Sequence, residues 1–279
     1  MLATRILTAL VLVPLTLAAL FLLPAAGWAM VSLAVIVVAA AEWANLAGYR
    51  GPSWLLFVGG TLAIGASLLF AGGSGFDRGW PTPVVLAVCG AATLFWVIAA
   101  PLWLRSGWRP TSPLAMAAIG WLVLVGAWVA IAELQARSPW LVLAAMAIVW
   151  IADTAAYFAG RAFGRRKLAP SISPGKTWEG VYGALVAVAV YAAVLVPFAR
   201  DAGYTGEFGP GAVVLWIAFA LVLAGLSICG DLLESLLKRQ AGVKDSGRLL
   251  PGHGGVLDRT DALLAAMPPA AIATLLFLR

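Results

Sequence analysis

The sequence predicts an all-α, polytopic integral membrane protein with about nine transmembrane helices. Hydrophobic residues fill 63% of the 279 positions, charged residues fill only 11%, and the mean hydropathy is +0.98. A soluble domain carries about 25% charged residues, whereas a hydrocarbon core of about 30 Å requires about 20 apolar residues per helix. Nine apolar runs meet this length, at 6–23, 28–48, 54–71, 82–104, 113–134, 140–160, 179–199, 211–237 and 261–278.

The first apolar run raises one alternative, a signal peptide that is removed after export. Arg5 would supply its basic flank, and Ala25, Ala26 and Gly27 would supply the small residues of a cleavage site. The apolar core of this run is longer than the usual length of about 7 to 15 residues. A retained transmembrane helix is therefore the favoured interpretation.

The distribution of positive charge predicts the topology. With nine spans, fourteen of the eighteen Lys and Arg residues fall on one side of the membrane, and the other side holds Arg78, Arg137, Arg200 and Arg279. Because cytoplasmic loops collect Lys and Arg, we expect the N-terminus in the cytosol and the chain in the cytoplasmic (inner) membrane. Ten of the fourteen lie in loops 161–176 and 238–259, which predicts one active site facing the cytosol.

A single integral membrane domain over 1–279 is the simplest organisation. Residues 1–138 carry few polar groups and should act mainly as scaffold, whereas 139–279 should form the catalytic half. Cys89 and Cys229 lie inside apolar runs, which favours buried thiols over a disulfide. The isoelectric point near 9.7 does not indicate nucleic-acid binding, because the membrane topology accounts for the basic residues.

The stretch 235–261 concentrates most of the chemistry. Lys238, Arg239, Lys244 and Arg248 supply positive charge in the part before residue 251. The turn Pro-Gly-His-Gly-Gly at 251–255 can present backbone N–H groups, and Asp258 and Asp261 follow it three residues apart. Asp231 and Ser235 lie upstream on one helical face. Carboxylate oxygens are the ligands that magnesium prefers, so the three aspartates are candidate metal ligands beside an anion site.

Two alternatives within this stretch carry less chemistry. Asp231 and Lys238 could form only an interfacial salt-bridge face, which is common at such spacing. His253 is the only histidine, and no Ser-His-Asp arrangement can be assembled around it. We expect His253 to contact phosphate or to brace the glycine turn.

The sixth apolar run places a carboxylate inside the membrane. Asp153, Tyr157, Gly160 and Gly164 share one helical stripe. An acid at such depth normally faces a partner or a wet cavity, which favours a functional role for Asp153. The structural alternative is a buried acid paired with a neighbouring helix, with glycines that allow close helix packing.

The following segment, 171–180, contains a further candidate anion contact, Lys176. Ser173 or Thr177 could cap the next helix, and a helix N-terminus readily binds phosphate. The alternative is an ordinary turn with a lysine that reaches the membrane surface. The Gly-x-x-x-x-Gly-Lys-Ser/Thr spacing of a P-loop is absent from this segment, so a Walker-type NTPase is not supported.

The stretch 235–261 resembles the signature of the phosphatidate cytidylyltransferase family, whose members are also called CDP-diacylglycerol synthases. The shared pattern is Ser, two residues, Lys-Arg, four residues, Lys-Asp, then Pro-x-His-Gly-Gly and Asp-Arg-x-Asp. The segment 173–180 and the Asp153 stripe resemble a second region of the family. The resemblance covers the C-terminal half of the chain, while 1–140 is similar only in being apolar.

The resemblance implies a membrane nucleotidyltransferase of phospholipid biosynthesis that transfers CMP from CTP to phosphatidate, forming CDP-diacylglycerol and pyrophosphate. It implies Mg²⁺ or another divalent cation on Asp231, Asp258 and Asp261, with a second cation left open, and it makes Lys238 and Arg239 catalytic. The implied substrate-binding residues are Ser235, Lys244, Lys176, Ser173, Arg248, His253, Arg259, Asp153 and Tyr157. The implied partners are CTP, phosphatidate and membrane lipid, without nucleic acid, and a homodimer is left open.

Two other functions remain as alternatives. A CTP-dependent lipid-alcohol kinase of the polyprenol type could use a similarly basic, metal-bearing pocket. A transporter of phosphorylated solutes could place basic loops and Asp153 along a substrate path. The transporter gives no reason for Asp258 and Asp261 to follow a glycine turn.

Overall fold

The computed structural model describes residues 2–71, 76, 79–198 and 209–277, with the backbone alone for 2–5. Arg78, Arg200 and Arg279, which entered the topology prediction, lie outside the described residues, as does the side chain of Arg5.

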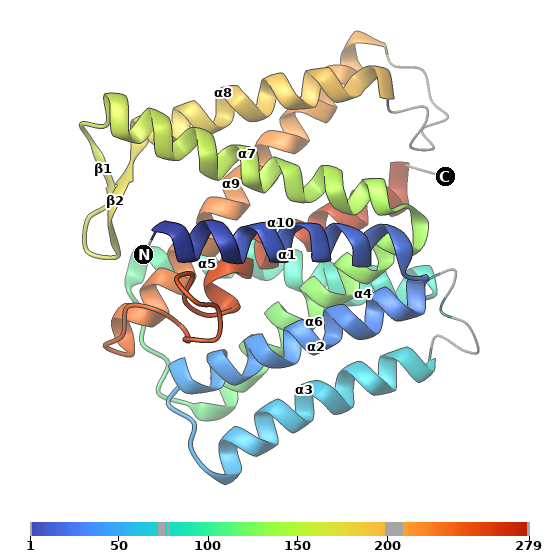
Figure 1. Ribbon diagram of the computed structural model, residues 1–279, viewed down its shortest axis with the longest axis vertical. Coiled ribbons are helices and arrows are strands. Elements are labelled where there is room, and N and C mark those ends of the chain that lie inside the picture. Colours follow the sequence, from blue (N-terminus) through green and yellow to red (C-terminus); the bar gives the residue numbers. More distant parts are fainter. Residues whose placement is uncertain (1, 72–75, 77–78, 199–208, 278–279) are drawn as a thin grey trace.

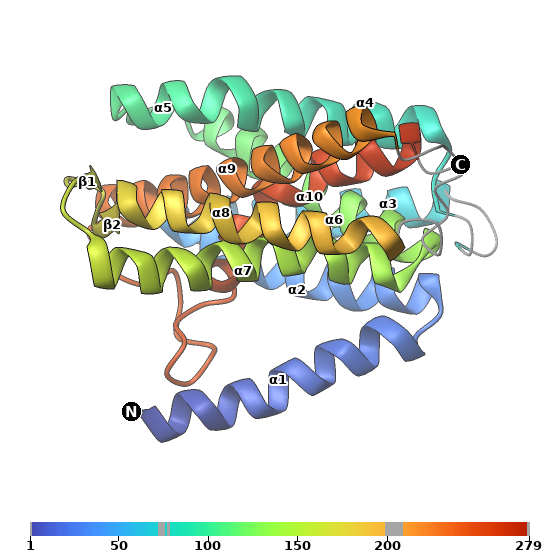
Figure 2. The ribbon, with the colours of Figure 1, turned by 90° about the horizontal axis from the view of Figure 1, so that it is seen from above.

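The fold is a bundle of long helices that run roughly along one direction (Figures 1 and 2). The helices are α1 (Leu2–Leu22), α2 (Ala25–Leu46), α3 (Pro52–Ala71), α4 (Thr82–Leu94), α5 (Ala100–Ser106), α6 (Pro113–Arg137), α7 (Pro139–Phe163), α8 (Trp178–Leu195), α9 (Pro210–Gln240) and α10 (Leu257–Phe277). A π-helical turn at Phe95–Ala99 joins α4 and α5 into one span, and a 3₁₀ turn at Val196–Phe198 extends α8. Figure 2 shows α1 at one side of the bundle.

Within the described residues, eight helical segments are long and apolar enough to cross a membrane. The apolar part of α1, Ile6–Leu22, is shorter than those eight. The all-α, polytopic membrane class is therefore confirmed. The count of nine spans and the cytosolic N-terminus stay predictions.

The segment between α7 and α8 forms a short hairpin where the sequence indicated only a loop. Strands β1 (Lys167–Ala169) and β2 (Ser173–Thr177) are antiparallel, with Lys167 opposite Thr177 and Ala169 opposite Ser173. The Thr177 hydroxyl accepts a hydrogen bond of 3.2 Å from the Gly180 N–H and caps α8. Of the two predicted caps, Thr177 is confirmed and Ser173 is wrong, because Ser173 lies at the far end of the strand.

Helices α7 and α8 pack through small residues. A Cβ placed on Gly160 would lie 3.0 Å from the Thr177 hydroxyl, and one on Gly180 would lie 2.8 Å from the Ala156 carbonyl oxygen. These glycines therefore allow close helix packing inside the chain, as the structural alternative proposed. The homodimer stays untested.

Helix α10 lies at the centre of the bundle and is the span with the largest buried share among the described candidates. It contacts α2, α4, α6, α7 and α9. The helix begins at Leu257, four residues before the predicted boundary of 261. Asp258 and Asp261 therefore lie in its first turns, one turn of helix apart.

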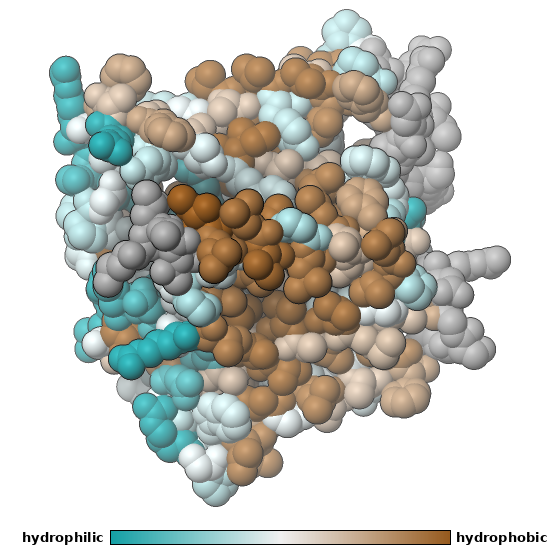
Figure 3. All heavy atoms as spheres, in the orientation of Figure 1, coloured by the Kyte–Doolittle hydropathy of each residue, from teal (hydrophilic) through white to brown (hydrophobic). Residues whose placement is uncertain are grey.

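Polar residues gather at one end of the molecule. In Figure 3, hydrophobic residues cover the middle, and hydrophilic residues cover the left end, where Figure 1 shows the β1–β2 hairpin. The same end carries the C-terminus of α9, the loop 241–256 and the start of α10 (Figure 1). This end brings the predicted site segments together.

Candidate active site

Lys176 and Asp231 join the hairpin to α9. The Lys176 ammonium lies 2.6 Å from a carboxylate oxygen of Asp231, and the two side chains are 25% and 31% exposed. The Ser235 hydroxyl donates to the other Asp231 oxygen at 3.3 Å, one helical turn along α9. A partly exposed ion pair of this kind can exchange its partner for an incoming phosphate at little cost.

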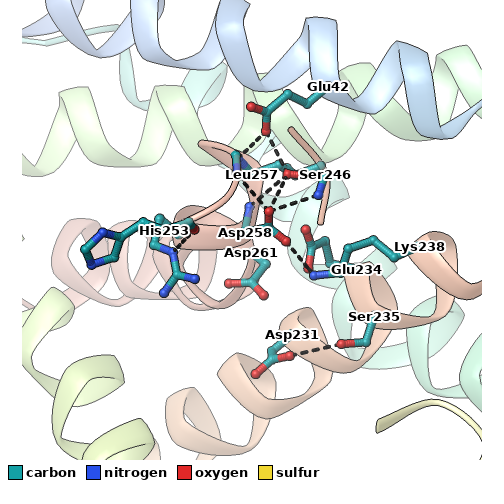
Figure 4. Close-up of polar contacts among 12 residues, drawn as sticks. Glu42, Asp231, Glu234, Ser235, Lys238, Ser246, His253, Leu257, Asp258 and Asp261 are labelled. Atoms are coloured by element: carbon teal, nitrogen blue, oxygen red, sulfur yellow. Dashed lines mark hydrogen bonds and ion pairs between the residues drawn. The ribbon is translucent and has the colours of Figure 1, made fainter. Parts of the chain in front are cut away.

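Lys238 joins α9 to α10. Its ammonium forms ion pairs with Glu234 and, at 2.6 Å, with Asp258 (Figure 4). The Lys238 side chain is 13% exposed, and those of Glu234 and Asp258 are each 5% exposed. Two carboxylates with buried side chains thus share one partly buried cation, which stabilises the ammonium form of Lys238.

Asp258 is held by four groups. Its Oδ1 accepts a hydrogen bond from the Lys238 ammonium. Its Oδ2 accepts hydrogen bonds from the Ser246 N–H at 2.9 Å, the Gly255 N–H at 2.8 Å and the Ser246 hydroxyl at 3.0 Å. The turn before α10 supplies the Gly255 N–H, and Gly254 in this turn adopts a positive φ of 82°. A Cβ at Gly254 would lie 2.6 Å from the Asp258 carboxylate. The glycine turn therefore wraps around this aspartate.

Asp261 of α10 is a further acid of the site. Figure 4 shows its carboxylate on the side of α10 that faces Asp231 and Glu234. It is within electrostatic range of both acids and of Lys176. Asp153 on α7 is likewise within electrostatic range of Asp231 and Lys176. The structure thus collects acids from α7, α9 and α10 around two lysines.

The acids do not form a closed metal site as they stand. Among the described residues, no three His, Cys, Asp or Glu side chains are arranged to hold an ion. Asp258 is directed at Lys238 and Ser246 instead. The assignment of Asp231, Asp258 and Asp261 as metal ligands therefore stays a prediction.

Glu42 of α2 reaches this site from the N-terminal half. Its carboxylate accepts from the Val256 N–H at 2.9 Å, the Leu257 N–H at 2.7 Å and the Ser246 hydroxyl at 2.8 Å (Figure 4). Only 6% of Glu42 is exposed. The N-terminal half therefore contacts the site directly.

Three predicted residues have roles near the site rather than among its carboxylates. The Arg239 Nε donates to the Ile172 carbonyl at 3.3 Å and ties α9 to the hairpin. The Arg259 Nε donates to the His253 carbonyl at 2.9 Å and braces the glycine turn. The His253 imidazole points away from the carboxylates in Figure 4.

The remaining predicted residues lie further from the carboxylates or at the surface. The Tyr157 hydroxyl accepts from Arg161 at 3.2 Å on the exposed side of α7. Ser173 belongs to strand β2. Lys244 and Arg248 are exposed in the loop 241–256. Their roles as substrate contacts stay predictions.

Sequence reasoning did not assign Glu234, Ser246 or Glu42 to the site. Glu234 shares the helical face of Asp231 and Lys238, one turn from each, but the shared face does not indicate a role in the site. Glu42 is an acid inside an apolar run, and the sequence favoured a structural or interfacial role for it. Its partners, more than 200 residues away, follow no local pattern.

The chain is similar to known proteins over nearly its whole length. The profile of the cytidylyltransferase family matches residues 3–277. The chain is 40% identical over 279 residues to a phosphatidate cytidylyltransferase of Pseudomonas aeruginosa, covering 96% of this chain and 95% of the relative. It is 35% identical over 283 residues to the phosphatidate cytidylyltransferase of Haemophilus influenzae, covering 96% of each. The relative from Brucella suis, of the same name, is 37% identical over 268 residues, covering 95% and 90%.

A helical membrane bundle with lysines and carboxylates gathered at one end has the features of a membrane enzyme that handles phosphate groups. The match over 3–277 and the near full-length relatives then define the family. The chain belongs to the cytidylyltransferase family.

Proposed function

We propose that this chain is a phosphatidate cytidylyltransferase, which transfers CMP from CTP to phosphatidate. Its products are CDP-diacylglycerol and pyrophosphate. The relatives that it matches over nearly full length carry this name. The observation that carries the proposal is the pair of lysine contacts, Lys176 with Asp231 and Lys238 with Asp258, at the polar end of the bundle.

The reaction requires no strong general base. A phosphate monoester loses its second proton with a pKa of about 6, so the phosphatidate phosphate is a competent nucleophile at neutral pH. One of its oxygens bonds to the α-phosphorus of CTP, and the bond from that phosphorus to the bridging oxygen breaks. Pyrophosphate leaves with the electron pair. The direction of the His253 imidazole, away from the carboxylates in Figure 4, agrees with such a mechanism.

The site must bind two anionic substrates, CTP and phosphatidate, close to each other. The ammonium groups of Lys176 and Lys238 now contact carboxylates and are positioned to turn toward incoming phosphates. Clustered positive charge lowers the barrier by offsetting the charge that develops during phosphoryl transfer. Arg239 and Arg259 hold the surrounding segments in place.

Asp231 and Asp261 fit a divalent cation by the chemistry of their oxygen ligands. They lie within electrostatic range of each other, and Asp258 lies one turn before Asp261 on α10. We propose that these three aspartates hold Mg²⁺, while a second cation stays a prediction. When bound, Mg²⁺ would neutralise triphosphate charge and orient the α-phosphorus.

We further propose that the site faces the cytosol from the cytoplasmic membrane. The described basic residues of the hairpin and of the loop 241–256, such as Lys167 and Lys244, lie at the site end of the bundle. Such residues accumulate on the cytoplasmic side. CTP and pyrophosphate would then enter and leave through water, while both lipids stay in the inner leaflet.

One assay tests the function. Purified protein is given phosphatidate, Mg²⁺ and CTP labelled in cytosine, and the label is followed. Label in the lipid supports the proposal, and its loss with a chelator and return with added Mg²⁺ supports the metal. Label in soluble CDP, with a lipid-alcohol acceptor, would indicate a kinase. Solute flux without nucleotide breakdown would indicate a transporter.

A further inference from the structure

The carboxylate of Glu42 is enclosed by the loop and helix that carry Asp258. One oxygen accepts from Val256, and the other accepts from Leu257 and from the Ser246 hydroxyl. A Cβ on Gly247 or on Gly255 would overlap this carboxylate. The loop 241–256 therefore packs against Glu42 with its backbone, and no larger residue fits at these two glycines.

The contacts of Glu42 meet a requirement of α10. The first N–H groups of a helix have no partner within the helix, and a carboxylate near that end is favoured by the helix dipole. The Glu42 carboxylate accepts hydrogen bonds from the N–H groups of Val256 and Leu257. The two backbone donors to Asp258 both go to its Oδ2, and its Oδ1 contacts Lys238.

Ser246 connects Glu42 to Asp258. Its hydroxyl lies 2.8 Å from a Glu42 oxygen and 3.0 Å from the Asp258 Oδ2, and it accepts from the Asp258 N–H at 3.3 Å. Since a hydroxyl has one proton, the two carboxylates share one donor. A displacement of the Glu42 carboxylate would therefore move the Ser246 hydroxyl, which contacts Asp258.

We propose that Glu42 is a positioning residue for cytidylyl transfer, which holds α10 and Ser246 so that the Asp258 carboxylate stays in place when Lys238 turns toward phosphate. The inference rests on the proposed function. It assigns part of the active-site geometry to the N-terminal half of the chain. Glu42 acts through Ser246 and Asp258 and needs no contact with substrate.

The test is Glu42→Gln, which keeps the size of the side chain. A Gln nitrogen must face an N–H group that now donates to a carboxylate oxygen, because both Glu42 oxygens receive backbone donors. Misplacement of a reacting group by about 1 Å lowers the rate by about 100-fold, and we expect this fall in kcat. Both KM values should stay within about threefold. Amide hydrogen exchange at 246–258 should accelerate by about tenfold or more.

Glu133→Gln is the matched control. Glu133 is another buried acid of the N-terminal half, 1% exposed, and it accepts from the Trp80 N–H at 3.0 Å and pairs with Arg137. It lies at the C-terminal end of α6, away from the site residues. We expect kcat within about threefold of wild type and unchanged exchange at 246–258.

Ser246→Ala is the second variant, and it tests the connection from Glu42 to Asp258 if Glu42→Gln does not fold. It removes the shared hydroxyl and should lower kcat by about tenfold. Equal losses of kcat in Glu42→Gln and Glu133→Gln, or unchanged exchange at 246–258, would overturn the proposal. A normal kcat in Ser246→Ala would do the same. Wild-type protein that forms no CDP-diacylglycerol would overturn the proposed function instead, while the exchange measurement still tests the Glu42 contacts.

Discussion

Replacing Lys238 with Met should destabilise the protein, because it leaves two buried carboxylates without their shared cation. Glu234 and Asp258 are each 5% exposed, so water cannot replace the ammonium. Removing one partner of a buried ion pair costs about 3 to 5 kcal/mol. Asp258 keeps its bonds from Ser246 and Gly255, which places the expected cost at the lower end, about 3 kcal/mol.

A second substitution separates stability from activity. Adding Glu234→Gln to Lys238→Met removes the charge that was left without a partner and should restore about 1 to 2 kcal/mol. Cytidylyl transfer should stay low in both variants, because the ammonium proposed to hold phosphate is missing from each. Stability and activity should therefore respond differently to the second change.

Thermal unfolding in detergent measures the effect. A loss of 1 kcal/mol lowers the Tm by about 2 to 4 °C in a chain of about this size. The Tm of Lys238→Met should therefore fall by about 6 to 12 °C. Lys167→Met, at an exposed position of β1, is the control and should stay within about 0.5 kcal/mol of wild type.

Two results would refute this reasoning. A Tm for Lys238→Met within 2 °C of the Lys167→Met control, about 0.5 to 1 kcal/mol, would mean that Lys238 does not neutralise buried acids. A double variant no more stable than Lys238→Met would mean that Glu234 is not the group left without its partner.

Three further predictions follow from other contacts of the site. Asp258→Asn should lower kcat by about 10² to 10³-fold in protein that still elutes as a folded species; near-normal turnover would remove Asp258 from the site. Lys176→Met should raise the KM for CTP by about tenfold and change stability by less than about 1 kcal/mol, because its ion pair with Asp231 is partly exposed. Unchanged KM values for both substrates would show that Lys176 is a solvated lysine without a substrate contact. Thr177→Ala should cost about 1 kcal/mol, since the Gly180 N–H loses its cap, and an unaltered Tm would contradict that cap.

Most of the membrane architecture could be predicted from the sequence. Long apolar runs specify spans because the bilayer requires backbone hydrogen bonds to be made within each helix. Several boundaries are also local: α6 and α7 begin at Pro113 and Pro139, where the missing proline N–H is not needed. The hairpin and the early start of α10 were not predicted, because short strands and helix starts depend on partners outside the segment.

The site was predicted in part. Asp231, Ser235 and Lys238 follow a helical spacing, and the Pro-Gly-His-Gly-Gly turn is visible as a pattern. The pairing of Lys176 with Asp231, and of Lys238 with Asp258, is not. Each pair joins different elements, so no periodicity in one segment indicates it.

The sequence by itself determined that the chain is a helical membrane protein, and it predicted that the phosphate chemistry lies in 235–261. Composition and local spacing indicate both, because span length and helical face depend on nearby residues. Only the tertiary structure decided that Glu42 holds the start of α10 and that each lysine meets a particular acid. Such contacts join residues far apart in the chain, and they form where packing brings a buried donor to a buried acceptor.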